Sequence, residues 1–246
     1  ANDSERVSVG GGSHSGRSMR LISIALRQAV DALLAKGVEL AASILQAAPS
    51  DVRYAAGTFT ADRASVDLWM LARTHGKGLE SAGEIFNQTG GFPYGSHVCE
   101  VEVDADTGRV AIVAWTGVDD VGLAINPLVL HGQAHGSVTQ GVGQALCEAV
   151  AYEPQTAQLL SASFMDYALP RADTLPSFTT RIMEVPASSH PMGIRPGGEG
   201  GTTPALGLVV NAIVHALAAY GVTDVAMPAT PERVWQTIQA ARRTMG

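Results

Sequence analysis

The segment that most constrains the fold is a glycine-rich stretch near the C-terminus that surrounds one carboxylate, Glu199. A glycine pair stands on each side of it, and the largely apolar residues 205–220 follow. Glycine tolerates left-handed dihedrals and lets the backbone approach a neighbour closely, so this pattern predicts a tight loop before a buried helix. A carboxylate held in such a loop is a candidate catalytic base, although the same pattern also describes an ordinary surface turn.

Composition narrows the kind of partner. The chain has 246 residues, of which 46% are hydrophobic and 16% are charged, as expected of a folded protein with a core. Its formal net charge of -7 argues against nucleic acid or an anionic membrane as the main partner, because both bind clustered Lys and Arg. A small molecule is therefore the expected ligand.

The cysteines and the apolar segments favour a cytoplasmic protein. Cys99 and Cys147 are the two cysteines and lie far apart, which excludes a disulfide framework and an iron–sulfur cluster on this chain. Asn211 and His215 interrupt residues 205–220, and this stretch is short for a bilayer span, which takes about 20 residues. The polar first residues lack the apolar region of a secretory signal, so a reducing cytoplasm is the expected compartment.

Hydrophobic periodicity predicts helices and hairpins in alternation, without an internal repeat. The predicted elements, in chain order, are a strand at 6–9 that enters a glycine loop, a helix at 19–36 ended by Gly37, a second helix to Pro49, a hairpin at 52–60, a helix from Ser65 to His75, a hairpin at 99–115, a glycine-rich helical segment from Asn126 to Ala151, a strand at 179–185, a helix at 204–220 ended by Gly221, and a helix from Pro231 capped by Thr230. This order indicates an α+β fold rather than a repeating βαβ unit.

The glycine loop at residues 10–18 is a second candidate binding segment. It is small and polar, it contains an arginine, and it precedes a predicted helix N-terminus. Backbone N–H groups and hydroxyls in such a loop suit phosphate or another anion, helped by the helix dipole. The other interpretation is a flexible loop without a ligand.

A third candidate is the glycine-rich segment 132–144. Gln133 and Gln140 are about two helical turns apart and share one helix face, where their amides suit the edge of a heterocycle. The alternative is a helix packed tightly on a neighbour, with its glutamines in solvent. His131 and His135 are four residues apart, but no third ligand stands near them, so no metal site is predicted.

Seven segments in the same order make the chain similar to the C-terminal part of the molybdenum-binding large subunit of the xanthine dehydrogenase and aldehyde oxidase family. That family includes carbon monoxide dehydrogenase and bacterial N-heterocycle hydroxylases. The segments are 12–18, 101–108, 118–127, 132–146, 163–167, 198–200 and 230–234. The resemblance covers nearly the whole chain and implies that residues 1–246 form the second molybdopterin-binding domain, as a fragment or a split part of the large subunit.

The resemblance also implies the cofactor and its contacts, because the glycine loop and the two-glutamine segment hold the pterin in this family. The implied contacts are Ser13, His14, Ser15, Gly16, Arg17, Ser18, Gln133, Ala134, His135, Gly136, Gln140, Gly141 and Gly198. The implied cofactor is molybdopterin with molybdenum, in the cytosine dinucleotide form. Partner subunits with 2Fe-2S clusters and FAD, and the remaining part of the large subunit, are expected to complete a hetero-oligomer.

Glu199 matches the glutamate that acts as base in the family. In the family mechanism the base takes a proton from a hydroxyl on molybdenum, the oxygen attacks an electron-poor C–H carbon of an aldehyde or N-heterocycle, and hydride passes to a sulfido ligand. Water supplies the oxygen. We further expect Arg195, four residues upstream, to favour the ionised form of Glu199.

The chain also departs from the family's pattern. Many relatives have Lys-Gly-Val before Gly-Glu, where this chain has Arg195, Pro196 and Gly197, so its loop is expected to bend differently. Many relatives have Ser at the position of Gly16, whose absence removes a hydroxyl from the cofactor loop. The family's N-terminal regions, which complete the molybdenum pocket, are missing here, so turnover is expected only in a complex. The alternative function is a non-catalytic cofactor-binding or assembly module.

Overall fold

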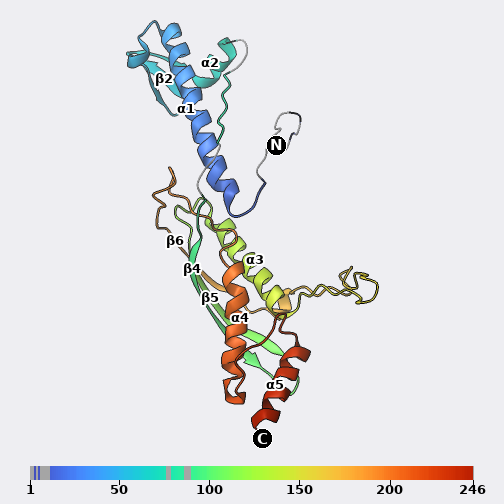
Figure 1. Ribbon diagram of the computed structural model, residues 1–246. Helices are drawn as coiled ribbons and strands as arrows, with labels where there is room; N and C mark the ends of the chain where they lie inside the picture. Colours follow the sequence, from blue (N-terminus) through green and yellow to red (C-terminus); the bar gives the residue numbers. More distant parts are fainter. Residues whose placement is uncertain (1–2, 4, 6–11, 76–78, 86–89, 246) are drawn as a thin grey trace. The chain divides into compact units, whose positions relative to one another are not determined.

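The computed structural model describes residues 3, 5, 12–75, 79–85 and 90–245, which form two compact units (Figure 1). The first unit is built on residues 17–90 and the second on residues 13–16 and 91–246. The strand predicted at 6–9 lies outside the described residues. Each unit mixes helix and sheet, which confirms the α+β class.

The first unit packs a long helix against a small antiparallel sheet with the strand order β1-β2-β3. Its elements are α1 (Arg17–Leu45), the 3-10 turn η1 (Pro49–Asp51), β1 (Arg53–Ala55), β2 (Thr58–Ala61), β3 (Ala64–Asp67) and α2 (Leu68–Thr74). Ala56 and Gly57 join β1 to β2 with φ values of 46° and 82°, the left-handed pair that a tight hairpin turn requires. The hairpin predicted at 52–60 is thereby confirmed.

Two predicted helix boundaries in the first unit are wrong. Helix α1 runs through Gly37 without a break, because this glycine is buried and makes room for the ring of Phe59, onto which a Cβ would fall. Ser65 lies in β3 and does not cap a helix. The cap is Asp67, whose Oδ1 accepts a hydrogen bond of 2.8 Å from the Met70 N–H and so opens α2.

The second unit is a three-stranded sheet with helices packed on it (Figure 1). Its elements are β4 (Tyr94–Val103), β5 (Val110–Asp120), α3 (Pro127–Leu146), the 3-10 turn η2 (Ala172–Thr174), β6 (Thr179–Met183), α4 (Thr202–Ala216), the 3-10 turn η3 (Ala218–Tyr220) and α5 (Pro231–Met245). β4 pairs antiparallel with β5, and β5 pairs parallel with β6. Helices α3 and α4 contact each other, and they contact β6 and β4 respectively.

Burial and capping explain the elements of the second unit. Trp115 of β5 is fully buried with Val138 of α3, and both belong to the core that continues through α4 and α5. The Asn126 side chain accepts from the Val129 N–H at 3.2 Å and begins α3, while Thr230 caps α5 through the Arg233 N–H at 3.3 Å. These predicted helix starts, and the hairpin predicted at 99–115, are confirmed.

The glycines of α3 fall into two groups. A Cβ on Gly141 would meet the Thr202 carbonyl oxygen at 2.6 Å, so this glycine lets α4 approach closely, and Gly143 is closed off by Pro170 and Glu148. Gly132 and Gly136, in contrast, face open space on an exposed side of the helix. The predicted close packing is therefore confirmed for the C-terminal half of α3 only. Within the described ranges, no helix has the length and apolar character needed to span a membrane.

We expect opposite effects from alanine at two helical glycines. Gly37→Ala should destabilise the protein by about 1–3 kcal/mol, because the new methyl overlaps the Phe59 ring. The matched control is Gly207→Ala in α4, where nothing lies near the new methyl, and it should stabilise by about 0.5–1 kcal/mol. Thermal unfolding of both variants tests this, and a Tm increase for Gly37→Ala would contradict the packing argument.

We expect Cys99 to react slowly with alkylating reagents in the folded protein. Burial, and then the neighbouring Glu100 carboxylate, raise the pKa of the Cys99 thiol to about 11, and only the thiolate is nucleophilic. At pH 8 its iodoacetamide reaction should be roughly a hundredfold slower than that of the unfolded chain. The rate, followed by peptide mass spectrometry, should rise with pH up to about 11. Equal rates in folded and unfolded protein would be the contrary result.

Candidate functional site

Glu199 lies at the end of the loop that enters α4 and is held from the other end of the chain. Its Oε1 accepts a hydrogen bond of 3.0 Å from the backbone N–H of Ser15. Its own carbonyl accepts from the Thr202 N–H at 3.3 Å, where α4 begins. The side chain is otherwise exposed, so one carboxylate is both anchored and open to a ligand.

The loop at Ser15 adopts the backbone shape that directs its N–H to the carboxylate. Ser15 and Gly16 have φ values of 53° and 62°, so two consecutive residues are left-handed. Such a conformation is costly at a serine and easy at a glycine. The sequence predicted an anion site in this loop, and the anion that the Ser15 amide binds in this structure is the Glu199 carboxylate.

The two positions that depart from the family's pattern contact each other. An ideal Cβ on Gly16 would lie 2.8 Å from the Cα of Pro196 and would overlap the proline ring. This chain has glycine at position 16 and proline at position 196, so the absence of a side chain at Gly16 makes room for the proline ring. The sequence interpreted them as two independent departures, because nothing local links them.

Helix α3 lies along the Glu199 loop. An ideal Cβ on Gly198 would be 4.0 Å from Oε1 of Gln133, and the Thr202 hydroxyl donates to the Ser137 carbonyl oxygen at 3.0 Å. Three segments named from the sequence therefore meet here, because residues 13–16 and Gln133 both lie beside the loop of Glu199. Helical periodicity puts Gly136 and Gln140 on the same exposed side of α3 as Gln133.

Other residues named from the sequence lie elsewhere. Ala134 is buried, and Gly141 packs against α4, so neither presents a surface to a ligand. His135 lies on the side of α3 opposite Gln133, with its Nε2 3.2 Å from the Thr180 hydroxyl. Arg17 and Ser18 begin α1 in the first unit, whereas His14 stays beside Ser15, with its Nδ1 3.1 Å from the Ser15 hydroxyl.

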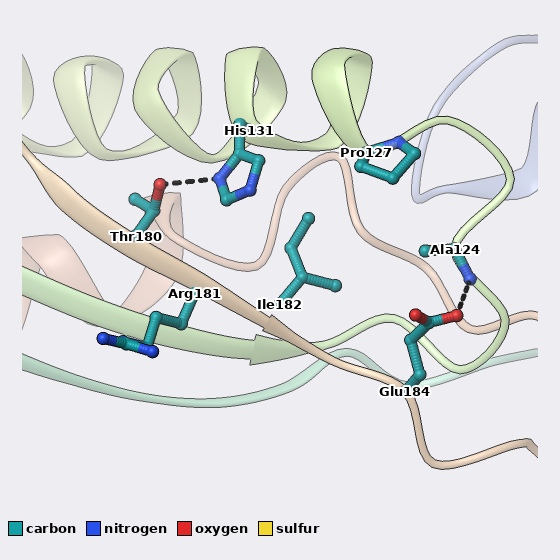
Figure 2. Close-up of a pocket in the computed structure, with 7 residues that line it drawn as sticks. All are labelled: Ala124, Pro127, His131, Thr180, Arg181, Ile182 and Glu184. Carbon is teal, nitrogen blue, oxygen red and sulfur yellow. Dashed lines mark hydrogen bonds between the residues drawn. The ribbon is translucent and has the colours of Figure 1, made fainter.

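The two histidines of α3 contact Thr180 of β6. His131 Nδ1 lies 2.8 Å from the Thr180 hydroxyl, which His135 also contacts. A cavity of about 320 Å³ opens beside His131, and Glu184, which also lines it, accepts a hydrogen bond of 2.9 Å from the Ala124 N–H (Figure 2). Among the described residues, no group of three or more His, Cys, Asp or Glu could hold a metal ion.

Arg195 has a different partner from the one expected. Its Nε is 3.1 Å from a carboxylate oxygen of Asp120 and donates to the Val185 carbonyl at 3.0 Å. The guanidinium also lies over the ring of Tyr94, 4.8 Å from its centroid. The charge of Arg195 is therefore directed to Asp120, and its expected influence on Glu199 stays a prediction. Asp120 ends β5, and its pairing with the Arg195 loop could not be predicted from sequence distance.

Sequence reasoning missed a buried pair under the loop. His97 and Asp119 lie on neighbouring strands with their side chains 3.2 Å apart, and Gly200 packs directly on the Asp119 carboxylate. Asp119 belongs to a segment that carried the resemblance, but its partner follows from strand register. The alternation of apolar and polar residues along β4 was the available sequence signal for this pair, since it predicts which residues share a face of the sheet.

Comparison with known proteins identifies the family of the chain. The sequence model of the molybdopterin cofactor-binding domain family matches residues 1–176. The chain belongs to this family. The match spans residues of both compact units, and it includes the glycine loop and α3 with Gln133.

Similar proteins include chains of bacterial dehydrogenases and oxidoreductases. The chain is 32% identical over 255 residues to the gamma subunit of the 6-hydroxypseudooxynicotine dehydrogenase complex of Paenarthrobacter nicotinovorans, covering 98% of this chain and 32% of that one. It is 28% identical to the carbon monoxide dehydrogenase large chain of Hydrogenophaga pseudoflava, covering 96% and 31%. The crystal structure of quinoline 2-oxidoreductase from Pseudomonas putida 86 superposes with a TM-score of 0.79 at 28% identity, covering 94% and 31%. The chain thus spans about a third of the length of these relatives.

We expect the Gly16 and Pro196 positions to be coupled. Gly16→Ser should destabilise the second unit by about 1–3 kcal/mol, because its side chain runs into Pro196. Adding Pro196→Gly should recover part of that loss by removing the proline ring, while the φ of 62° and the Cα of residue 196 keep the remainder. Pro196→Gly alone should cost about 0.4–1 kcal/mol through backbone entropy. A double-mutant cycle from thermal or chemical unfolding measures the coupling, and additive effects would rule it out.

Proposed function

We propose that this chain is the second molybdopterin-binding domain, residues 1–246, of a molybdenum hydroxylase, and that Glu199 is the general base of the reaction. The substrate class is an aldehyde or an N-heterocycle, hydroxylated at an electron-poor C–H carbon with oxygen from water. The observation that carries the proposal is the anchored and exposed carboxylate of Glu199, beside Ser15 and Gln133. A surface turn would not need a hydrogen bond to a loop 184 residues away.

The residues around Glu199 fit a flat, polar cofactor. On one exposed side of α3, Gly132 and Gly136 have nothing within 4 Å of an ideal Cβ, which leaves space for a ring system close to the helix. Gln133 and Gln140 on that side can donate and accept hydrogen bonds at the edge of a pterin. The amide and hydroxyl groups of residues 13–16 would serve its polar substituents. We therefore keep Gln133, Gly136, Gln140, Gly198 and residues 13–16 as proposed contacts.

The chemistry that this chain supplies is proton removal. When bound, the cofactor supplies a molybdenum centre that accepts the two electrons of the oxidation. The Ser15 N–H fixes Oε1 of Glu199, so the side chain is oriented before a substrate arrives, and Oε2 can accept a proton from the attacking hydroxyl. The glycines around Glu199 permit a close approach to the bound group.

We propose that the enzyme works as a hetero-oligomer in the cytoplasm. One relative is named as a subunit of a complex, which supports a hetero-oligomer. The remaining part of the large subunit is proposed to complete the site. The proposed cofactor is the cytosine dinucleotide form of molybdopterin, with 2Fe-2S clusters and FAD on further subunits. The cysteines Cys99 and Cys147 are free thiols, in keeping with a reducing compartment.

The decisive test of this function is Glu199→Gln in the assembled complex. Glutamine keeps the size and can still accept from Ser15, but it cannot take up a proton, so turnover should fall at least a hundredfold. Turnover is measured with a panel of aldehydes and N-heterocycles and an artificial electron acceptor, together with the molybdenum and pterin content. The matched control is Glu102→Gln, on the exposed face of β4, which should retain full activity.

The outcomes separate the two functional classes. Lost turnover with native molybdenum and pterin content supports a catalytic base. Full activity of Glu199→Gln would exclude that role, and a native complex without molybdenum would favour the non-catalytic assembly module.

A further inference from the structure

A chain of three hydrogen-bonded side chains is buried between β4 and β5. The indole Nε1–H of Trp115 donates to Nδ1 of His97 at 3.2 Å, and Nε2 of His97 lies 3.2 Å from Oδ1 of Asp119. The side chain of His97 is 2% exposed and that of Asp119 is 12% exposed. Such a polar chain has a defined direction, because each member must match a donor to an acceptor.

The indole determines the proton positions along this chain. A tryptophan N–H can donate but cannot accept, so Nδ1 of His97 has to accept from Trp115. The ring hydrogen of a neutral His97 is then on Nε2, which donates to Asp119. The carboxylate is therefore held in one orientation by a ring that is itself held at its far side.

Glycines on the facing strand make room for this pair. His97 is opposite Gly117 in the β4–β5 register, and an ideal Cβ on Gly117 would lie 2.7 Å from the imidazole. Asp119 is opposite Gly95, where a Cβ would lie 2.6 Å from Oδ1. Each of the two polar side chains thus lies over a glycine on the facing strand. Side chains at these two positions would displace the pair, so the strands are built around it.

The carboxylate of Asp119 also supports the loop that carries Glu199. An ideal Cβ on Gly200 would lie 3.1 Å from Oδ1 of Asp119 and 3.6 Å from Cβ of Pro93. The backbone directly after Glu199 therefore rests on the same oxygen that His97 holds. The glycines of this loop can adopt many backbone conformations, so contacts such as that of Gly200 with Asp119 are needed to fix its shape.

We propose that Asp119 is a positioning residue for Glu199, held in place by His97 and Trp115. Its Oδ1 fixes the backbone at Gly200, and this keeps the Glu199 carboxylate in reach of the Ser15 N–H. Stability alone is a weak reason for such a buried polar pair, since replacing both hydrogen-bonding partners with apolar groups of the same shape can be nearly neutral or stabilising. The expected effect of Asp119 on kcat rests on the proposed function of Glu199 as base. The expected effect of Asp119 on the position of the Glu199 side chain does not.

The test uses Asp119→Ala and Asp119→Asn in the assembled complex. Alanine removes the support under Gly200, so kcat should fall between about ten- and a hundredfold with KM unchanged within about twofold. Hydrogen exchange at the Ser15 amide, followed by mass spectrometry, should accelerate about tenfold. Asparagine keeps an Oδ1 that accepts from His97, so it should restore both properties. Asp106→Asn, at an exposed turn of the same hairpin, is the matched control and should behave as the native protein.

A variant on the loop side tests the same contact without changing the buried pair. Gly200→Ala introduces a methyl 3.1 Å from Oδ1 of Asp119, which displaces the loop by a few tenths of an ångström. It should accelerate exchange at Ser15 and lower kcat even if Asp119→Ala fails to fold. Native exchange and native kcat in Gly200→Ala, or in a folded Asp119→Ala, would overturn the proposal.

A double variant separates this proposal from the proposed function. If Asp119 acts through Glu199, then Asp119→Ala should reduce kcat no further in a Glu199→Gln background. A full, additive loss there would overturn the positioning role. If Glu199→Gln instead retains full activity, the proposed base is wrong, and exchange at Ser15 still decides whether Asp119 positions the Glu199 side chain.

Discussion

The hydrogen bond from the Ser15 N–H to Glu199 is the interaction on which the candidate site depends. Glu199 is exposed and flanked by glycines, so without this bond its carboxylate would sample many positions. The loop that presents this N–H has two consecutive residues, Ser15 and Gly16, in the left-handed conformation. Gly16 also has to lack a side chain, because a Cβ there would overlap Pro196. A base acts efficiently when it is oriented before the substrate arrives, and this geometry provides that orientation with one backbone donor.

The remaining contacts of the Glu199 loop come from rigid elements. Helix α3 contacts it through Ser137, whose carbonyl accepts from Thr202, and the sheet contacts it through Asp119 beneath Gly200. Glycine is needed at each approach, since Gly141 lets α4 lie close to α3 and Gly200 lets the loop rest on a carboxylate. The glycines therefore allow the loop, the helices and the sheet to pack closely, and the helix and the strands keep the loop in place.

Local patterns predicted much of the fold but not its long-range contacts. Alternation in β4 and β5 and the Asn126 and Thr230 caps depend on neighbours in sequence, so they were readable. Gly37 resembled a helix end, yet it lies inside α1 because Phe59 packs on it. Arg195 was expected to serve Glu199 and instead pairs with Asp120. Both contacts involve partners that are distant along the chain.

The sequence by itself determined the order of elements in the second unit, the exposed glutamine side of α3 and the position of Glu199 before α4, because these depend on residue type and spacing. Tertiary structure alone decided that Ser15 binds Glu199, that Gly16 packs against Pro196, and that His97 holds Asp119 under the loop. The reason is physical. Strand register and loop packing set which distant residues meet, and a shift of one residue in register would put His97 and Asp119 on opposite faces of the sheet.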